Sequence, residues 1–206
     1  YLSSLYSTGY TFIYNARKVR PDEIPRSYED LLLPRWGGRL VMDREEYDFF
    51  AGLIGIMGEN KASQYLKRLV EEQGLIFKRG HTLISQLVAA GEHDLFVDGY
   101  VQNAVQLKTA KAPVEMVFMN PTIDKPPSAL AIAAKASHPH AAALLVDFYL
   151  SKEAQEILTN KLGYWIARKD VRWTQEFPGE LHIVPQLEWG RKYNELAENF
   201  KKIVGD

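Results

Sequence analysis

The sequence predicts an α/β protein with parallel strands, and the segment from Leu75 to Tyr100 carries that prediction. Leu75-Ile76-Phe77 is an apolar run that is too short for a helix and is bounded by glycines. The apolar positions of one helix face follow, at Leu83, Ile84, Leu87 and Val88. Thr82 is the expected N-cap of this helix, and Gly91 is placed to end it. A second apolar run, Leu95-Phe96-Val97, completes a strand–helix–strand unit, which is typical of a parallel sheet.

Elements of the same kinds are predicted ahead of this unit. Thr11–Tyr14 and Arg39–Met42 are expected as strands. A capping pattern at Ser27-x-x-Asp30 predicts a short helix that stops before Pro34. Apolar residues at helical spacing predict two further helices, one from Phe49 to Met57 and one around Tyr65–Val70.

The second half of the chain continues the alternation. Predicted helices cover 101–110, 141–150, 152–161 and, as one amphipathic element, 186–204. Predicted strands cover 113–118 and a buried apolar segment at 129–133. The segment 171–185 is expected to be irregular.

Polar side chains follow three of the predicted strands directly. Because the carboxyl ends of parallel strands meet at one edge of a sheet, next to helix N-termini, ligands gather there. The expected rim residues are Asp43, Arg44, Glu45 and Glu46 after one strand, Arg79, Gly80, His81 and Thr82 after the next, and Asp98, Gly99 and Tyr100 after the third. The sequence therefore predicts a polar site at this rim.

Composition limits the classes of function. The chain has 206 residues, a formal net charge of −1, 46% hydrophobic residues and no cysteine. The charge argues against a nucleic-acid binder that relies on a strong positive field, and the absent cysteine excludes thiol catalysis and disulfides. No GxSxG, HExxH or P-loop motif is present, so no enzyme is predicted.

Three segments carry a family resemblance. They are Pro25-Arg-Ser-Tyr-Glu-Asp-Leu-Leu-Leu-Pro-Arg-Trp-Gly-Gly-Arg39, Ala89-Ala-Gly-Glu-His-Asp-Leu-Phe96 and Ser137-His-Pro-His-Ala-Ala-Ala-Leu-Leu-Val-Asp-Phe-Tyr-Leu-Ser-Lys-Glu-Ala-Gln155. In this order they resemble bacterial extracellular solute-binding proteins of ABC importers, in the group that is similar to ferric-ion-binding proteins. The resemblance extends from about Tyr10 to the C-terminus.

The resemblance implies a type II periplasmic-binding fold, with two α/β lobes joined by crossing strands. Residues 1–14 would be a remnant of lobe one with the first hinge strand, and 15–116 would form lobe two. Residues 117–170 would supply the second hinge and the rest of lobe one, and 171–206 would return to lobe two as a helical segment. Few residues precede the first crossing, at Ile13–Asn15, so lobe one is expected to be incomplete. Exposed apolar surface between Ala129 and Leu150 would then favour a homodimer.

The resemblance also suggests a metal site. The family's ferric-ion binders hold iron with two adjacent tyrosines, and the matching positions are Gly99 and Tyr100, so one phenol is missing. Tyr100 and His81 are the residues expected to ligate ferric iron if iron is the solute, since Fe(III) favours anionic oxygen donors. No resident cofactor is predicted.

Organic solutes fit the same rim residues. Asp43, Glu46 and Asp98 could hold a cationic amine, with Tyr47 and Tyr100 against it. Arg44 and Arg79 could instead hold a carboxylate or phosphonate. The sequence leaves the charge of the solute open.

The function that follows is solute capture for an ABC importer, outside the cytoplasm, with the transporter permease as partner. A signal peptide is not in this chain and is expected upstream. A ligand-sensing domain of a regulatory protein is the alternative, because sensors share this fold.

Overall fold

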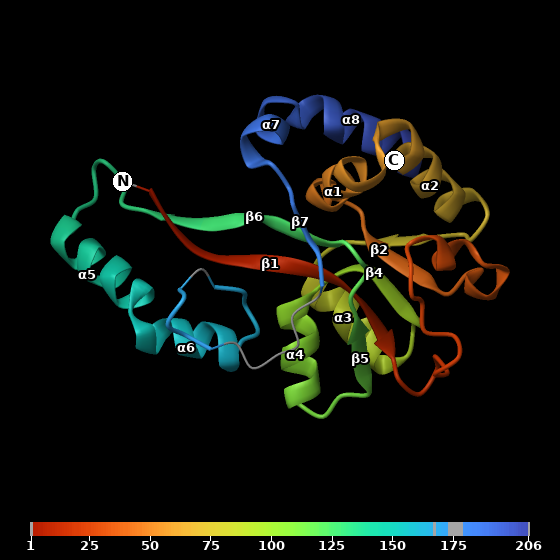
Figure 1. The fold of residues 1–206 in the computed structure, drawn as a ribbon, viewed down its shortest axis with the longest axis horizontal. Coiled ribbons are helices and arrows are strands. Elements are labelled where there is room, and N and C mark those ends of the chain that lie inside the picture. The colour runs from red at the N-terminus through yellow and green to blue at the C-terminus, as the bar shows by residue number, and fades with distance from the viewer. Residues whose placement is uncertain (1, 167, 173–178, 206) are drawn as a thin grey trace.

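A single long strand organises the computed structural model, which describes residues 2–166, 168–172 and 179–205. This strand, β1 (Leu2–Asn15), pairs with β6 (Thr122–Ala131) over Leu2–Gly9. Over Tyr10–Asn15 it pairs instead with β4 (Leu95–Tyr100) and β5 (Val114–Val117). The strand order is β3-β2-β4-β1-β6-β7, with β5 beside β1, so β1 connects the two parts of the molecule (Figure 1).

The larger part contains the predicted parallel sheet. β2 (Leu40–Asp43) pairs in parallel with both β3 (Ile76–Lys78) and β4. The unit β3–α3–β4, with α3 at His81–Ala90, confirms the strand–helix–strand prediction. Gly91 ends α3 in the left-handed conformation, as predicted, but the N-cap is Gly80 rather than Thr82, so the helix begins two residues earlier.

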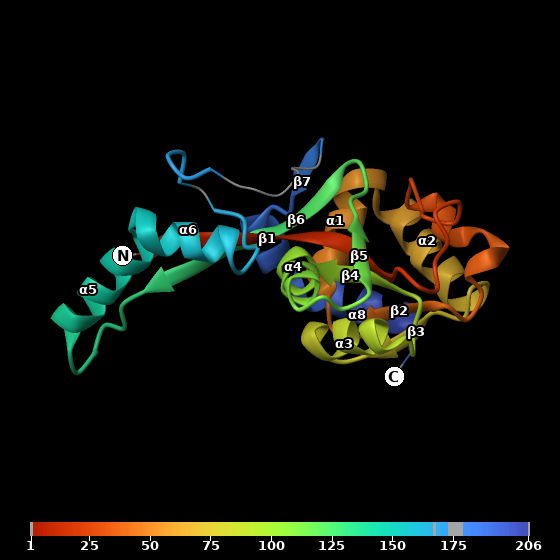
Figure 2. The ribbon, with the colours of Figure 1, turned by 90° about the horizontal axis from the view of Figure 1, so that it is seen from below.

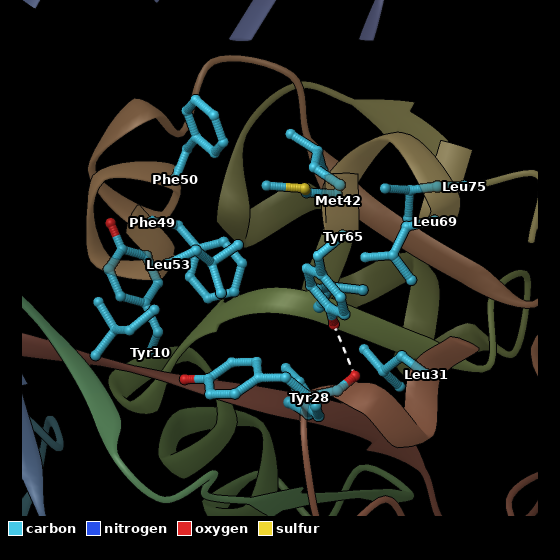
Figure 3. Packing of buried hydrophobic residues seen from close by; sticks show 14 of the residues in the cluster. Tyr10, Tyr28, Leu31, Met42, Phe49, Phe50, Leu53, Tyr65, Leu69 and Leu75 are labelled. Atoms are coloured by element: carbon cyan, nitrogen blue, oxygen red, sulfur yellow. Dashed lines mark hydrogen bonds between the residues drawn. The ribbon is translucent and has the colours of Figure 1, made fainter. Parts of the chain in front are cut away.

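Helices cover both faces of this sheet. α1 (Tyr47–Met57), α2 (Glu59–Glu71) and α8 (Tyr193–Val204) lie on one face, and α3 and α4 (Val101–Thr109) lie on the other (Figure 1). The larger core cluster lies under α1, α2 and α8, where Phe49, Met42 and Leu53 pack together (Figure 3). There the Tyr65 hydroxyl donates to the Tyr28 carbonyl at 2.9 Å, which satisfies a polar group in the core. Two short 3-10 turns, Glu29–Leu32 and Pro34–Trp36, close the edge of this core.

The smaller part extends along β1 and β6, as Figure 2 shows. Its helices are α5 (Pro139–Leu150) and α6 (Lys152–Asn160), whereas β7 (Leu181–Ile183) pairs in parallel with the start of β6 and lies against α1 of the larger part (Figure 1). Ser151 caps α6, as predicted, since its hydroxyl accepts from the Ala154 amide at 3.2 Å.

Two predicted elements differ from the structure. The strand expected at 129–133 ends at Ala131 and begins at Thr122, so it includes Pro126 and Pro127, and several of its last residues are exposed rather than buried. The prediction was wrong because apolar composition alone does not place a strand on a covered face. The helix expected over 186–204 is two helices, α7 (Gln186–Arg191) and α8, which separate at Lys192. The segment expected to be irregular at 171–185 contains the short strand β7 at Leu181–Ile183, because its backbone pairs with β6, and 173–178 lies outside the described residues.

The expected apolar exposure between Ala129 and Leu150 is confirmed. α5 contains no buried residue, and Leu144, Leu145 and Phe148 are 71%, 54% and 49% exposed. The homodimer that this surface would favour stays a prediction.

A core leucine and an exposed leucine provide a matched test of this packing. Leu53→Ala should lower the free energy of unfolding by about 2–5 kcal/mol, because Leu53 is 0% exposed and its truncation leaves a cavity in the core. Leu187→Ala should change it by less than about 0.5 kcal/mol, because Leu187 is 84% exposed. Urea denaturation of the two variants measures both changes, and equal effects would contradict the assignment of the core.

Candidate functional site

Five polar side chains from five different segments converge where β1 passes from one part of the molecule to the other. We call them the Glu46 cluster: Tyr10 of β1, Glu46 at the N-cap of α1, His81 at the start of α3, Tyr100 at the end of β4 and Lys125 of β6. Strand register brings them together, because Tyr10 is paired with Tyr100 and Thr8 is paired with Lys125. The cluster therefore lies at the predicted rim, at the carboxyl ends of the parallel strands.

Glu46 is the centre of the cluster. Glu46 is only 6% exposed, and both of its carboxylate oxygens accept hydrogen bonds. Oε1 accepts from the Tyr10 hydroxyl at 2.5 Å and from Lys125 Nζ at 2.9 Å, and Oε2 accepts from the Tyr100 hydroxyl. A buried carboxylate needs partners of this kind to offset its loss of hydration.

Lys125 provides the positive charge. Its Nζ atom donates to Glu46 Oε1 and to the Tyr100 oxygen, each at 2.9 Å, and lies 3.3 Å from Asp48 Oδ2. Burial alone would lower the pKa of Lys125, but Glu46 and Asp48 together raise it, so the ammonium stays charged.

The charged neighbours of Glu46 lower its pKa, whereas those of Lys125 raise the pKa of the lysine. Burial would raise the pKa of Glu46, but Lys125, His81 and the two tyrosine hydrogen bonds outweigh burial and lower it. Burial and the nearby Glu46 charge raise the pKa of both Tyr10 and Tyr100, so both phenols stay protonated and donate.

His81 stacks on Tyr100, with ring centroids 3.7 Å apart and an interplanar angle of 4°. Its Nε2 atom lies 3.2 Å from Glu46 Oε2 but makes no aligned hydrogen bond within the described residues. Burial lowers the pKa of His81 even though Glu46 and Asp43 act to raise it. His81 therefore favours its neutral form, with Nε2 buried beside the Glu46 carboxylate.

Asp43 and Asp98 form a framework behind the cluster. Asp43 accepts from the Gly80 amide at 2.7 Å and from the Glu45 amide at 2.9 Å, which fixes the loops that carry His81 and Glu46. Asp98 Oδ1 accepts from the Asp43 amide at 3.0 Å. Asp98 is 0% exposed, and burial together with the Glu46 charge raises its pKa well above the usual value.

Gly99 belongs to the same framework. A Cβ atom at this position would lie 2.6 Å from the side chain of Ile13, so a larger residue here would require Ile13 to move. Gly99 therefore gives Ile13 of β1 the space to pack on β4.

The remaining predicted residues lie elsewhere. Arg44, Tyr47 and Arg79 line a separate pocket of about 300 Å³, together with Lys201 at the end of α8. Tyr47 packs edge-on against Tyr193 and Phe200 rather than facing the cluster. Thr82 accepts a 3.3 Å hydrogen bond from Asn103. Of the predicted residues, the structure thus brings together Glu46, His81, Tyr100, Asp43, Asp98 and Gly99.

Sequence reasoning missed Tyr10, Lys125 and Asp48. Tyr10 and Lys125 lie on strands that pass through the crossing, and only their register with the other strands places them at the rim. Asp48 is in the first turn of α1, two residues after Glu46, and its position after the predicted rim residues was a usable signal.

A pocket of about 380 Å³ adjoins the cluster. Lys125 and Asp48 line it on one side, and Trp189 and Tyr193 line it on the other. It has room for a small organic molecule, with charged and aromatic groups together.

No group of three or more histidine and acidic side chains is arranged to hold a metal ion in the described part of the chain. No helix among those residues is both long and apolar enough to cross a membrane.

Comparison with curated proteins gives two partial matches. An uncharacterized protein of Haemophilus influenzae is 29% identical over 165 residues, which is 76% of this chain and 47% of that protein. An Fe(3+)-binding periplasmic protein of Serratia marcescens is 26% identical over 162 residues, covering 71% of this chain and 46% of that protein. The chain thus spans about half the length of the curated relatives that it matches.

Solved structures share the fold. The periplasmic binding protein AfuA of Actinobacillus pleuropneumoniae, with exogenous fructose-6-phosphate bound, superimposes with a TM-score of 0.82 at 23% identity. The match covers 98% of this chain and 68% of AfuA. The fold is that of type II periplasmic binding proteins, as predicted, and the partial chain fits an incomplete lobe.

The family model of the bacterial extracellular solute-binding proteins matches residues 4–180, which is most of the chain and includes the whole Glu46 cluster. The chain belongs to the bacterial extracellular solute-binding protein family.

Proposed function

We propose that this chain is the solute-binding component of a bacterial ABC importer, acting outside the cytoplasm and delivering its solute to a membrane permease. The observation that carries the proposal is the convergence of Tyr10, Glu46, His81, Tyr100 and Lys125 at the crossing strands, beside a pocket of suitable size. Binding proteins of this kind close two lobes around a solute, and a polar site at the crossing would be covered by that closure.

Three classes of solute have a physical basis in this site. An organic anion would approach Lys125, or the separate pocket of Arg44 and Arg79. A cationic amine would use the carboxylate of Asp48 and the aromatic faces of Trp189 and Tyr193. Ferric iron would need the phenols, carboxylate and imidazole of the cluster itself.

The solutes named for the relatives also belong to different chemical classes. The Serratia marcescens relative is named for Fe(3+), and the AfuA structure contains fructose-6-phosphate. Membership of the family therefore supports solute binding without naming the solute. The family also favours a binding role over the regulatory alternative and over an enzyme.

The residues have different roles in this proposal. Lys125 and Asp48 are partly exposed to the pocket and would contact the solute. Tyr100, stacked on His81, lies behind Lys125 and accepts a hydrogen bond from its ammonium, so both would position Lys125 for the solute. Asp98, which has no exposed surface, supports the rim through Asp43 and would not touch the solute.

A ligand panel tests the proposed function on the chain in its full natural length. Ferric citrate, phosphate, aminophosphonates, aromatic carboxylates, polyamines and thiamine are added separately in a thermal-shift assay. One class should raise the unfolding midpoint by several degrees, because a ligand at about 100 times its Kd adds about 2.7 kcal/mol to stability. A shift with none of these classes would contradict the proposal for the solutes tested.

Removal of one phenol links the binding to the cluster. Tyr100→Phe should weaken binding of the identified solute by about tenfold, because Lys125, which lines the pocket, loses a hydrogen-bond acceptor that positions its charge. Tyr149→Phe, on α5 and away from the cluster, should leave binding unchanged. Calorimetric titration of both variants measures the difference. If the two variants bind the solute with the same affinity, Tyr100 does not contribute to the binding site.

The buried Asp98 predicts a pH dependence of stability. Its pKa is raised in the folded state, whereas in the unfolded chain it is about 3.9. Above that pH, unfolding releases a proton, so the contribution of Asp98 to stability falls as the pH rises toward the folded pKa. Asp98→Asn, which stays neutral, should therefore be more stable than the natural chain near pH 7, and this gain should be lost near pH 4.

Urea denaturation at several pH values checks this dependence. Asp147→Asn is the matched control, because Asp147 is exposed on α5. A stability difference between Asp98→Asn and the natural chain that does not vary with pH would show that Asp98 is ionised in the folded protein.

A further inference from the structure

The Glu46 cluster has the donor set of a site for a hard cation. Two phenol oxygens and an imidazole nitrogen, of Tyr10, Tyr100 and His81, lie against the carboxylate of Glu46. Oxygen-rich sets that include phenols suit trivalent iron. The chemistry of the donors by itself would therefore favour a metal ion.

A cation of the chain itself already occupies this cluster. The ammonium of Lys125 lies 2.9 Å from Glu46 Oε1, 2.9 Å from the Tyr100 oxygen and 3.3 Å from Asp48 Oδ2. A lysine ammonium has three N–H donors, and it has three acceptors here. The match leaves no donor of Lys125 unused and engages two of the oxygens that a metal would need, Glu46 Oε1 and the Tyr100 oxygen.

The backbone holds this ammonium in place. Lys125 lies within β6, where it is paired with Thr8 of β1, and its neighbour Asp124 is paired with Gly9. A tethered group competes with free ions at a high effective concentration, because it loses little freedom on binding. A metal ion would also meet the positive charge of Lys125 at short range in a partly buried site, where screening by water is weak.

We propose that Lys125 is a built-in cation that fills the Glu46 cluster and determines which solutes the protein accepts, excluding ferric iron in favour of organic solutes held in the adjoining pocket. This inference deepens the proposed function and rests on it for the identity of the solute. The exclusion of iron itself rests only on the geometry of the cluster. The protonated phenols are consistent with it, since neither tyrosine is prepared to act as a phenolate.

Replacing the ammonium by an uncharged side chain of similar length tests the proposal. Lys125→Met should bind ferric iron, supplied as ferric citrate, at least about tenfold more tightly than the natural chain, because no tethered cation competes for the donors. Binding should produce the visible charge-transfer absorption of a phenolate–iron(III) bond, which reports on the ligands directly. The natural chain should show no such absorption at iron concentrations that saturate Lys125→Met.

Three further variants make the result specific. Lys125→Arg keeps a positive charge and should remain without the absorption. Lys108→Met removes a lysine of another ion pair, with Glu115, and should behave as the natural chain does. Adding Tyr100→Phe to Lys125→Met should abolish most of the absorption. Circular dichroism checks that each variant is folded, and Lys125→Gln replaces Lys125→Met if the methionine variant is not.

The outcomes separate the two proposals. Iron bound with phenolate absorption by the natural chain would overturn the role of Lys125, as would a folded Lys125→Met that takes up no more iron than the natural chain. Neither result decides whether an organic solute binds, which the thermal-shift panel on the natural chain measures separately. If the panel is negative and Lys125→Met gains iron, the proposed function fails and the exclusion of iron by Lys125 stands.

Discussion

The buried carboxylate of Glu46 is the interaction on which the arrangement of the site depends. A carboxylate that is removed from water is stable only if hydrogen bonds and an opposite charge replace its hydration. Tyr10, Tyr100 and Lys125 supply these partners, and each comes from a different strand. The need to satisfy one charge therefore holds three strands and the start of α1 at a common point. The same charge keeps the lysine protonated and the phenols neutral.

The continuity of β1 explains why these partners can meet. One half of the strand pairs with β6, and the other half pairs with β4 and β5, so residues from both parts of the molecule are held in fixed register at the crossing. Tyr10 lies in this register opposite Tyr100 of β4, and Lys125 lies opposite Thr8 of β1. A site built on paired strands holds its side chains more rigidly than a site on free loops. This rigidity is what allows a lysine to act as a permanent occupant of the cluster.

The order of helices and strands in the larger part could be predicted from periodicity alone. The unit that contains β3, α3 and β4 has the expected apolar spacing. Gly91, which ends α3, has the left-handed conformation that glycine adopts without steric cost. The rim position of His81, Tyr100 and Asp98 followed from the rule that parallel strands end at one edge. The prediction was less successful where a face is uncovered or a strand bends, as at Pro126 and Pro127 of β6. Apolar residues there are exposed, and apolar composition could not distinguish them from buried ones.

The sequence by itself determined the class of fold, the family and one side of the rim, because these depend on local spacing and on short motifs. Only the tertiary structure decided that Glu46 is the centre of the site, that Tyr10 and Lys125 are its partners, and that Arg44, Tyr47 and Arg79 belong to another pocket. The physical reason is the sequence separation: Tyr10 and Lys125 are 36 and 79 positions from Glu46. Contacts over such distances are set by strand register and by the burial of charge, and neither of these leaves a local pattern in the chain.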